Sequence, residues 1–130
     1  MSDSYIAYGH IAEEREYVEK TVALAPEMVE QTVREYFADI PIMAEIARCE
    51  STYRHYLPDG KVLRGKVDDD DTGVMQINTR YHQQKADQLG LDLTNIYDNM
   101  AYARDLYERQ GTQPWSASAP CWKNHVATAM

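Results

Sequence analysis

Glu50 is the residue whose type and spacing most directly suggest chemistry in this sequence. It follows Met43, Ile46 and Ala47 at helical intervals, so a helix would place all four on one face. A carboxylate on an apolar face is costly to bury in its charged form, and its pKa should therefore rise. A carboxyl group with a raised pKa can act as a general acid near neutral pH. From the spacing alone, the simpler alternative is favoured, in which Glu50 lies at the edge of the stripe and contacts water.

Length and charge limit the classes of protein to consider. A chain of 130 residues is long enough for a single compact domain with one core. The net charge is −8 and no basic stripe is present, so nucleic-acid binding is not expected. No apolar run approaches the ~20 residues of a membrane span. No basic segment followed by an apolar one is visible at the start, so the sequence shows no signal peptide.

The apolar pattern predicts a mainly α fold, a helical bundle around the helix of Glu50 with a small β-hairpin or loop region. The spacing indicates helices at 10–25, 26–37, 41–50, 80–89 and 98–110. Proline suits the first turn of a helix, aspartate its N-cap and glycine the position after its end. These rules assign helix starts or caps to Pro26, Asp39, Pro41 and Asp98, and helix ends to Gly90 and Gly111.

The segment between Glu50 and the next predicted helix has a different character. Residues 57–60 predict a turn, and the loose alternation at 61–67 predicts an irregular β-hairpin or loop. An acidic run follows at 68–71. Aligned as a calcium-binding EF-hand loop from Asp68, its twelfth position is Thr79 and not the required glutamate. We therefore interpret 68–70 as a solvated charge cluster and expect no metal site.

Three motifs in order along the chain carry a family resemblance. Glu50-Ser51, the glycine-led segment Gly73-Val74-Met75-Gln76-Ile77, and Asn99 at the start of a late helix resemble the soluble lytic transglycosylase family of the lysozyme-like superfamily. Residues 71–81, DTGVMQINTRY, also resemble the active-site strand of animal c-type lysozymes. Together the likenesses cover roughly residues 41–122.

The cysteines carry a third likeness. Two buried free thiols and a disulfide closing a loop of more than seventy residues are both compatible with the positions of Cys49 and Cys121. However, a cysteine directly before the catalytic glutamate and a second one after a late tryptophan, here Trp115, resemble the resuscitation-promoting factors. That likeness implies a Cys49–Cys121 disulfide and an oxidising, extracytoplasmic setting, either the cell envelope or outside the cell.

These resemblances imply a function and an organisation. They imply cleavage of the β-1,4 bond between MurNAc and GlcNAc in peptidoglycan strands, without a cofactor and by a monomer, with Glu50 as general acid and base. The expected route is that of lytic transglycosylases, in which the sugar's own 6-hydroxyl attacks. The alternatives are a hydrolytic muramidase that uses Asp71 as second carboxylate, and a non-catalytic glycan-binding module. We expect N-terminal helices at 1–40 packed on a catalytic domain at 41–122, and a tail at 123–130.

The resemblance also implies a set of residues that contact the substrate, and most have a structural alternative. Ser51 can bond only to local backbone, Gln76 can be structural, Asn99 can cap a helix and Trp115 can be packing. Gly73 allows a close approach to a sugar or to the helix behind it. The family's tyrosine is replaced by leucine at position 106, so either Tyr102 or Tyr107 substitutes for it, or neither does and the contact is missing. The candidates are Ser51, Gly73, Met75, Gln76, Tyr81, Asn99, Tyr102 and Trp115.

Overall fold

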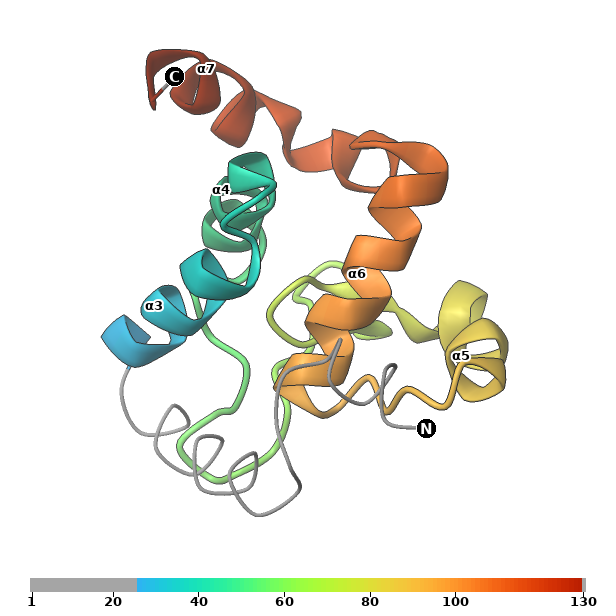
Figure 1. The fold of residues 1–130 in the computed structure, drawn as a ribbon. Helices are drawn as coiled ribbons and strands as arrows, with labels where there is room; N and C mark the ends of the chain where they lie inside the picture. The colour runs from blue at the N-terminus through green and yellow to red at the C-terminus, as the bar shows by residue number, and fades with distance from the viewer. Residues whose placement is uncertain (1–25, 130) are drawn as a thin grey trace.

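The computed structural model describes residues 26–129, and side-chain surroundings within 27–124. This part of the chain is mainly helical with one small two-stranded antiparallel sheet, which confirms the predicted fold class (Figure 1). The predicted helix at 10–25 and the lead-in before it lie outside the described residues. Within 26–129, no helix is both long enough and apolar enough to cross a membrane.

Helix α3 (Pro26–Tyr36) packs against α4 (Pro41–Ser51), the helix that carries Glu50. Both begin at the predicted prolines. The predicted cap by Asp39 is wrong: Ile40 precedes α4 and no side chain caps it. Asp39 instead accepts hydrogen bonds of 2.8 and 3.1 Å from Arg104. Pro41 has no backbone N–H, so the first turn of α4 has one hydrogen-bond donor fewer that needs a cap. The Asp39 carboxylate is therefore free to pair with Arg104.

The predicted apolar stripe of α4 faces the core. Met43, Ile46 and Ala47 are fully buried, together with α3 residues Val29 and Val33. Burial of such side chains contributes roughly 1.5–3 kcal/mol each, so this packing holds α4 firmly in place. Helix α4 continues for one turn after Ala47, the last residue of the apolar stripe, and ends at Ser51. Glu50 therefore lies in its last turn.

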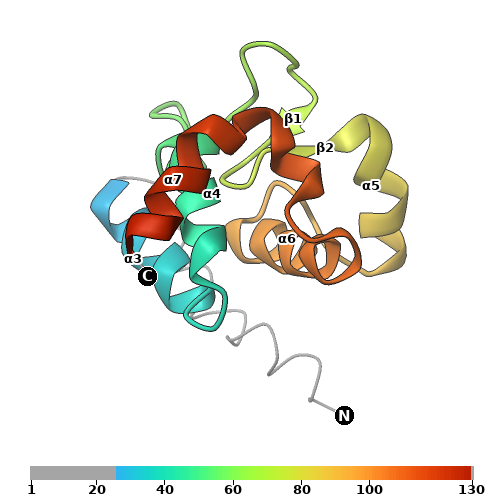
Figure 2. The same ribbon diagram turned by 90° about the horizontal axis from the view of Figure 1, so that it is seen from above.

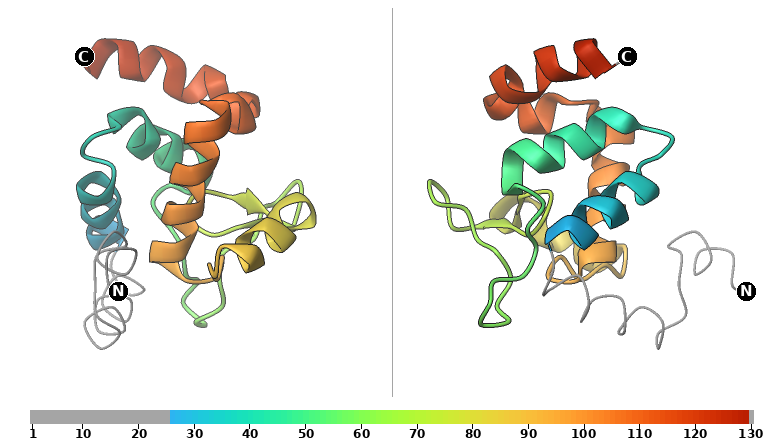
Figure 3. Two further views of the ribbon diagram at one scale, coloured as in Figure 1. Left: turned by 45° about the vertical axis from the view of Figure 1, so that its right-hand side comes forward. Right: turned by 90° about the vertical axis from the view of Figure 1, so that its left-hand side faces the viewer.

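The β region pairs in a way that the sequence pattern did not predict. Strand β1 (Asp71–Thr72) is antiparallel to β2 (Ile77–Asn78), with Asp71 opposite Asn78. Of the two predicted alternatives for 61–67, an irregular hairpin or a loop, the loop is observed, with isolated bridges such as that between Arg64 and Thr72. The turn at 57–60 is confirmed by a 2.8 Å hydrogen bond from the Gly60 N–H to the Leu57 carbonyl. Figure 3 shows this loop projecting from the helical body.

Helices α5 (Thr79–Gln88) and α6 (Ile96–Gln110) lie close to their predicted positions. Gly90 and Gly111 follow them with positive φ of 73° and 63°, a conformation that suits glycine. The predicted N-cap Asp98 lies inside the first turn of α6. Asn95 is the N-cap, and its side chain accepts a hydrogen bond from the Asp98 N–H.

The end of the chain is helical where we expected a polar tail. A 3₁₀ segment, η1 (Gln113–Ser118), leads into α7 (Ala119–Ala129). Helix α7 packs across α4 (Figure 2), and the Cys49–Cys121 disulfide joins the two helices. The disulfide that the resemblance implied is therefore present. Such bonds are typical of proteins that fold in an oxidising compartment.

Candidate active site

Glu50 lies in the last turn of α4 with its carboxyl group only partly exposed. Its Oε2 accepts a 2.6 Å hydrogen bond from the Ser118 hydroxyl. Burial raises the pKa of Glu50 above its ordinary value, the Ser118 hydrogen bond partly opposes the rise, and the charge of Asp71 adds to it. The raised pKa predicted from the apolar stripe is confirmed in direction.

Ser118 is the main contact of Glu50 that sequence reasoning missed. Its Oγ also lies 3.1 Å from the Trp115 carbonyl oxygen and accepts a 3.0 Å hydrogen bond from Trp122 Nε1. The serine comes from η1, 68 positions after Glu50, and no spacing rule connects the two. The only sequence signal was indirect: Cys121 follows it closely, and a disulfide to Cys49 brings this segment beside the glutamate.

An open cavity of about 520 Å³ is lined by both Glu50 and Asp71. It runs between the end of α4 and the loop before β1. Its walls combine charged, polar and apolar side chains, including the fully exposed Val67. The lining residues are Cys49, Glu50, Ser51, Thr52, Arg54, Leu57, Leu63, Arg64, Gly65, Lys66, Val67, Asp71 and Gln76. A pocket of this size and polarity can hold part of a polar chain.

Asp71 lines the cavity, whereas its neighbours Asp68, Asp69 and Asp70 do not. Burial raises its pKa, Asn78 opposes the rise by a hydrogen bond, and nearby acids contribute further. Asn78 Nδ2 donates to Asp71 Oδ1 at 3.0 Å, which fixes the orientation of the carboxyl group. By contrast, Asp68 and Asp70 form ion pairs with Arg80 at 3.1 and 3.0 Å outside the cavity. The acidic run is thus divided between one cleft residue, Asp71, and a charge cluster in which Asp68 and Asp70 pair with Arg80.

The cluster also brings one oxygen each of Asp68, Asp69 and Asp70 within 4.8 Å of one another, a geometry that could hold a cation. Arg80 already supplies positive charge to two of the three.

Gly73 serves packing and does not line the cavity. It has a φ of +75°, and an added Cβ would lie 2.6 Å from Asn99 Nδ2 and 2.7 Å from His55 Cε1. Of the two expected alternatives, close approach to the helix behind is the observed one. Any side chain here would push β1 away from α6 and disturb the position of Asp71.

Asn99 does not cap α6, as the sequence suggested, but is fully buried within it. Its Oδ1 accepts from the Met75 N–H at 3.0 Å. Its Nδ2 donates to the carbonyls of Thr72 and Leu93, both at 2.9 Å. Asn99 therefore holds the β1–β2 turn against α6, and its effect on the site is indirect.

Gln76 and Ser51 line the cavity and also have backbone partners. Gln76 has a φ of 51°, and its Nε2 donates to the Gly73 carbonyl at 3.0 Å. Ser51 donates to the Ala47 carbonyl at 3.0 Å and accepts from the Arg54 N–H at 3.3 Å. The serine next to the glutamate in sequence thus supports the helix end, while Ser118 contacts the glutamate itself.

Four further candidates lie away from the cavity. Met75, Tyr102 and Trp115 are buried in the core, where Tyr102 contacts His82 and Trp115 donates to the Met75 carbonyl. Their size and apolar surface favour burial over substrate contact. Tyr81 is 72% exposed and stacks against Arg80 outside the cavity. In place of these, the residues near the acid that sequence reasoning missed are Arg54, Arg64 and Lys66.

Comparison of the chain with models of protein families, with curated proteins and with solved structures gave no match.

Proposed function

We propose that this protein is a lysozyme-like glycosidase that cleaves the β-1,4 bond between MurNAc and GlcNAc in bacterial peptidoglycan. One observation carries the proposal: the partly buried Glu50, with a raised pKa, shares an open cavity with a second carboxyl group. Glycosidic cleavage needs an acid that protonates the leaving oxygen, and a raised carboxyl pKa keeps that proton available near neutral pH.

The hydrogen bond from Ser118 assigns roles to the two oxygens of Glu50. Oε2 accepts the hydroxyl proton at 2.6 Å, so Oε1 is the oxygen that carries the acid proton. Protonation of the glycosidic oxygen lets the aglycone leave while positive charge develops at the anomeric carbon. The resulting Glu50 carboxylate then takes the proton of the attacking nucleophile and returns to its acid form.

Asp71 favours hydrolysis as the outcome. A second carboxylate in the cavity can stabilise or attack the oxocarbenium-like centre, and water then completes the reaction. Its pKa is raised only by partial burial and neighbouring acids, and Asn78 holds its charged oxygen in place. We therefore place the muramidase route first, although the resemblance of 50–51 and 73–77 had favoured the lytic transglycosylase.

The lytic transglycosylase remains the second candidate, supported by those motifs. In that route Glu50 acts alone, first as acid and then as base, and the 6-hydroxyl of MurNAc closes a 1,6-anhydro ring. Both routes suit a monomeric protein that works outside the cytoplasm, in the envelope or after secretion. The Cys49–Cys121 disulfide supports such a setting.

Product analysis of purified peptidoglycan separates the candidates. We expect reducing MurNAc ends without anhydro-muropeptides, complete loss of cleavage in Glu50→Gln, and at least a ~100-fold loss in Asp71→Asn, because a charge-stabilising group is removed. Anhydro products together with an active Asp71→Asn variant would favour the transglycosylase. If the wild type and a folded Glu50→Gln variant are both inactive but bind glycan, the protein is a binding module.

A further inference from the structure

Within residues 27–124, the positive side chains that line the cavity of Glu50 differ from the other arginines in having no acidic partner. The whole chain carries a net charge of −8, yet Arg54, Arg64 and Lys66 all line the cavity. In residues 27–124, none of the three forms an ion pair with an acidic side chain. The arginines outside the cavity in that part of the chain all form such pairs, namely Arg34, Arg48, Arg80, Arg104 and Arg109.

The observed partners of the cavity arginines are neutral oxygens. Arg54 Nε donates to the Ser51 carbonyl at 3.0 Å and to Thr52 Oγ1 at 3.1 Å. Arg64 donates from one terminal nitrogen to Thr72 Oγ1 at 2.6 Å. These bonds orient the guanidinium groups without neutralising them. The cavity lining has three cations against two acidic residues, Glu50 and Asp71, and this excess of positive charge attracts anionic groups and raises their local concentration.

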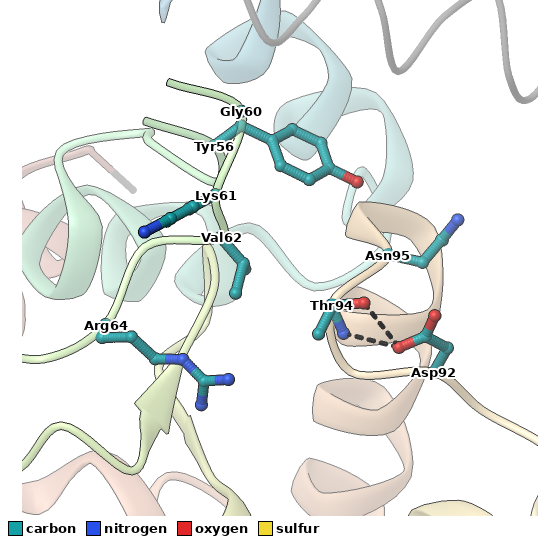
Figure 4. A pocket seen from close by; sticks show the side chains of 8 residues that line it. All are labelled: Tyr56, Gly60, Lys61, Val62, Arg64, Asp92, Thr94 and Asn95. Atoms are coloured by element: carbon teal, nitrogen blue, oxygen red, sulfur yellow. Dashed lines mark hydrogen bonds between the residues drawn. The ribbon is translucent and has the colours of Figure 1, made fainter. Parts of the chain in front are cut away.

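Arg64 also borders a second cavity of about 510 Å³, beside the catalytic one. Figure 4 shows Tyr56 and Arg64 extending from the loop on one side, opposite Asp92, Thr94 and Asn95 before and at the start of α6. The space beside Arg64 therefore accommodates a group considerably larger than a single carboxylate. Besides Arg64, its walls offer an aromatic ring, hydrogen-bonding side chains and one charged group of each sign, Lys61 and Asp92, which suit a short peptide with polar and charged groups.

On the basis of the proposed function, we infer that Arg54, Arg64 and Lys66 bind the carboxylates attached to the muramyl residue. The protein thereby selects acid-bearing peptidoglycan strands over neutral β-1,4 glycans such as chitin oligosaccharides. Two sources supply this chemistry: the lactyl carboxylate of bare MurNAc and the carboxylates of the peptide stem. Arginine can bind either in a bidentate manner. The second cavity favours the stem, because it provides room for the peptide.

Binding measurements test the inference independently of catalysis. The Glu50→Gln protein, which leaves ligands intact, is titrated with peptide-bearing muroglycan fragments, with the same fragments after amidase removal of the peptide, and with chitohexaose. We expect the affinity to fall in that order. Adding Arg64→Gln and Lys66→Gln should weaken binding of the peptide-bearing fragment about tenfold, as expected for two exposed charge pairs, and leave binding of chitohexaose within about twofold.

The matched control is Lys85→Gln with Lys123→Gln on the same background, which removes the same charge from exposed positions outside both cavities. It should change none of the three affinities. Equal weakening for chitohexaose would overturn the inference by showing a general effect on the cavity, and so would unchanged binding of the peptide-bearing fragment. Equal affinity for stripped and peptide-bearing fragments would assign the contact to the lactyl carboxylate. Failure of the proposed function shows separately, as absence of glycan cleavage by the wild type.

Discussion

A single hydrogen bond from Ser118 influences the pKa of Glu50. Because that bond stabilises the charged carboxylate, Ser118→Ala should raise the pKa of Glu50 further. We expect the alkaline limb of the kcat/KM profile to move up by about one pH unit, the value of one hydrogen bond to a charged group, while KM changes little. Ser118→Thr keeps a hydroxyl and should restore the wild-type profile. An unshifted profile in Ser118→Ala would show that the serine only supports the backbone.

The residues of the site differ in how far sequence could predict them. Glu50 was predictable because a helical stripe is a local pattern, and its raised pKa follows from burial. Asp71 was ambiguous because it sits in a run of like residues, and only pairing of its neighbours with Arg80 separates it from them. Ser118 and Asn99 depend on contacts between distant segments, for which one sequence carries no spacing rule.

At the scale of elements, the disulfide fixes α7 and η1 against the end of α4. It closes a loop with a sequence separation of 72 residues. Replacing both Cys49 and Cys121 by serine should lower the free energy of unfolding by about 4 kcal/mol in the chain-entropy model, measured by urea denaturation with circular dichroism. Because Trp115 and Trp122 are buried at this junction, tryptophan fluorescence should report local loosening at lower urea than circular dichroism.

Chemical reduction of the wild type provides the control for that prediction. The reduced protein should unfold at the same urea concentration as the double serine variant. A variant with an unchanged midpoint would show that side-chain packing alone holds α7 on α4. Loss of the disulfide should also loosen the segment that carries Ser118 and weaken its hydrogen bond to Glu50. The double serine variant should therefore show the same altered pH profile as Ser118→Ala.

The helices were more predictable than the sheet for a physical reason. Prolines and glycines act on their own backbone, so Pro26, Pro41, Gly90 and Gly111 mark helix ends correctly. Asp39 could accept a hydrogen bond either from the backbone of the helix that follows it or from a distant arginine. In the structure it pairs with Arg104. Strand pairing joins separate segments, and the short 61–67 alternation did not reveal that the paired residues are instead 71–72 and 77–78.

At the scale of the whole molecule, His55 connects three segments by hydrogen bonds: the loop after α4 that carries it, the turn between β1 and β2, and the residues just before α6. It is almost completely buried, accepts from the Val74 N–H at 3.0 Å and lies 2.7 Å from the Thr94 carbonyl. The first contact requires an unprotonated Nδ1, so the native ring is neutral with its proton on Nε2. Burial lowers its pKa from 6.5 to about 4. His55 therefore holds together the packing behind the cleft.

The pH dependence of stability follows from this histidine. Between pH 6.5 and about 4 the unfolded chain binds a proton at His55 that the native state excludes. The free energy of unfolding therefore falls as the pH falls through this window, by about 3 kcal/mol in total. Glu50 and Asp71 act in the opposite sense, because their raised pKa values make the native state bind more protons. The free energy of unfolding of the wild type therefore changes less steeply with pH than the contribution of His55 alone would predict.

Comparing His55→Gln with the wild type separates these contributions. Both carboxyl groups remain in the variant, so the difference between the two curves of unfolding free energy against pH isolates the histidine. The variant should be less stable at pH 7 by about 1–3 kcal/mol, since the Val74 N–H and Thr94 carbonyl lose well-placed partners. Near pH 4 the two proteins should approach equal stability, because the wild type has by then lost what the neutral ring contributed. Parallel curves across the window would mean that His55 titrates alike in the folded and unfolded chains, which its burial against Val74 and Thr94 does not allow.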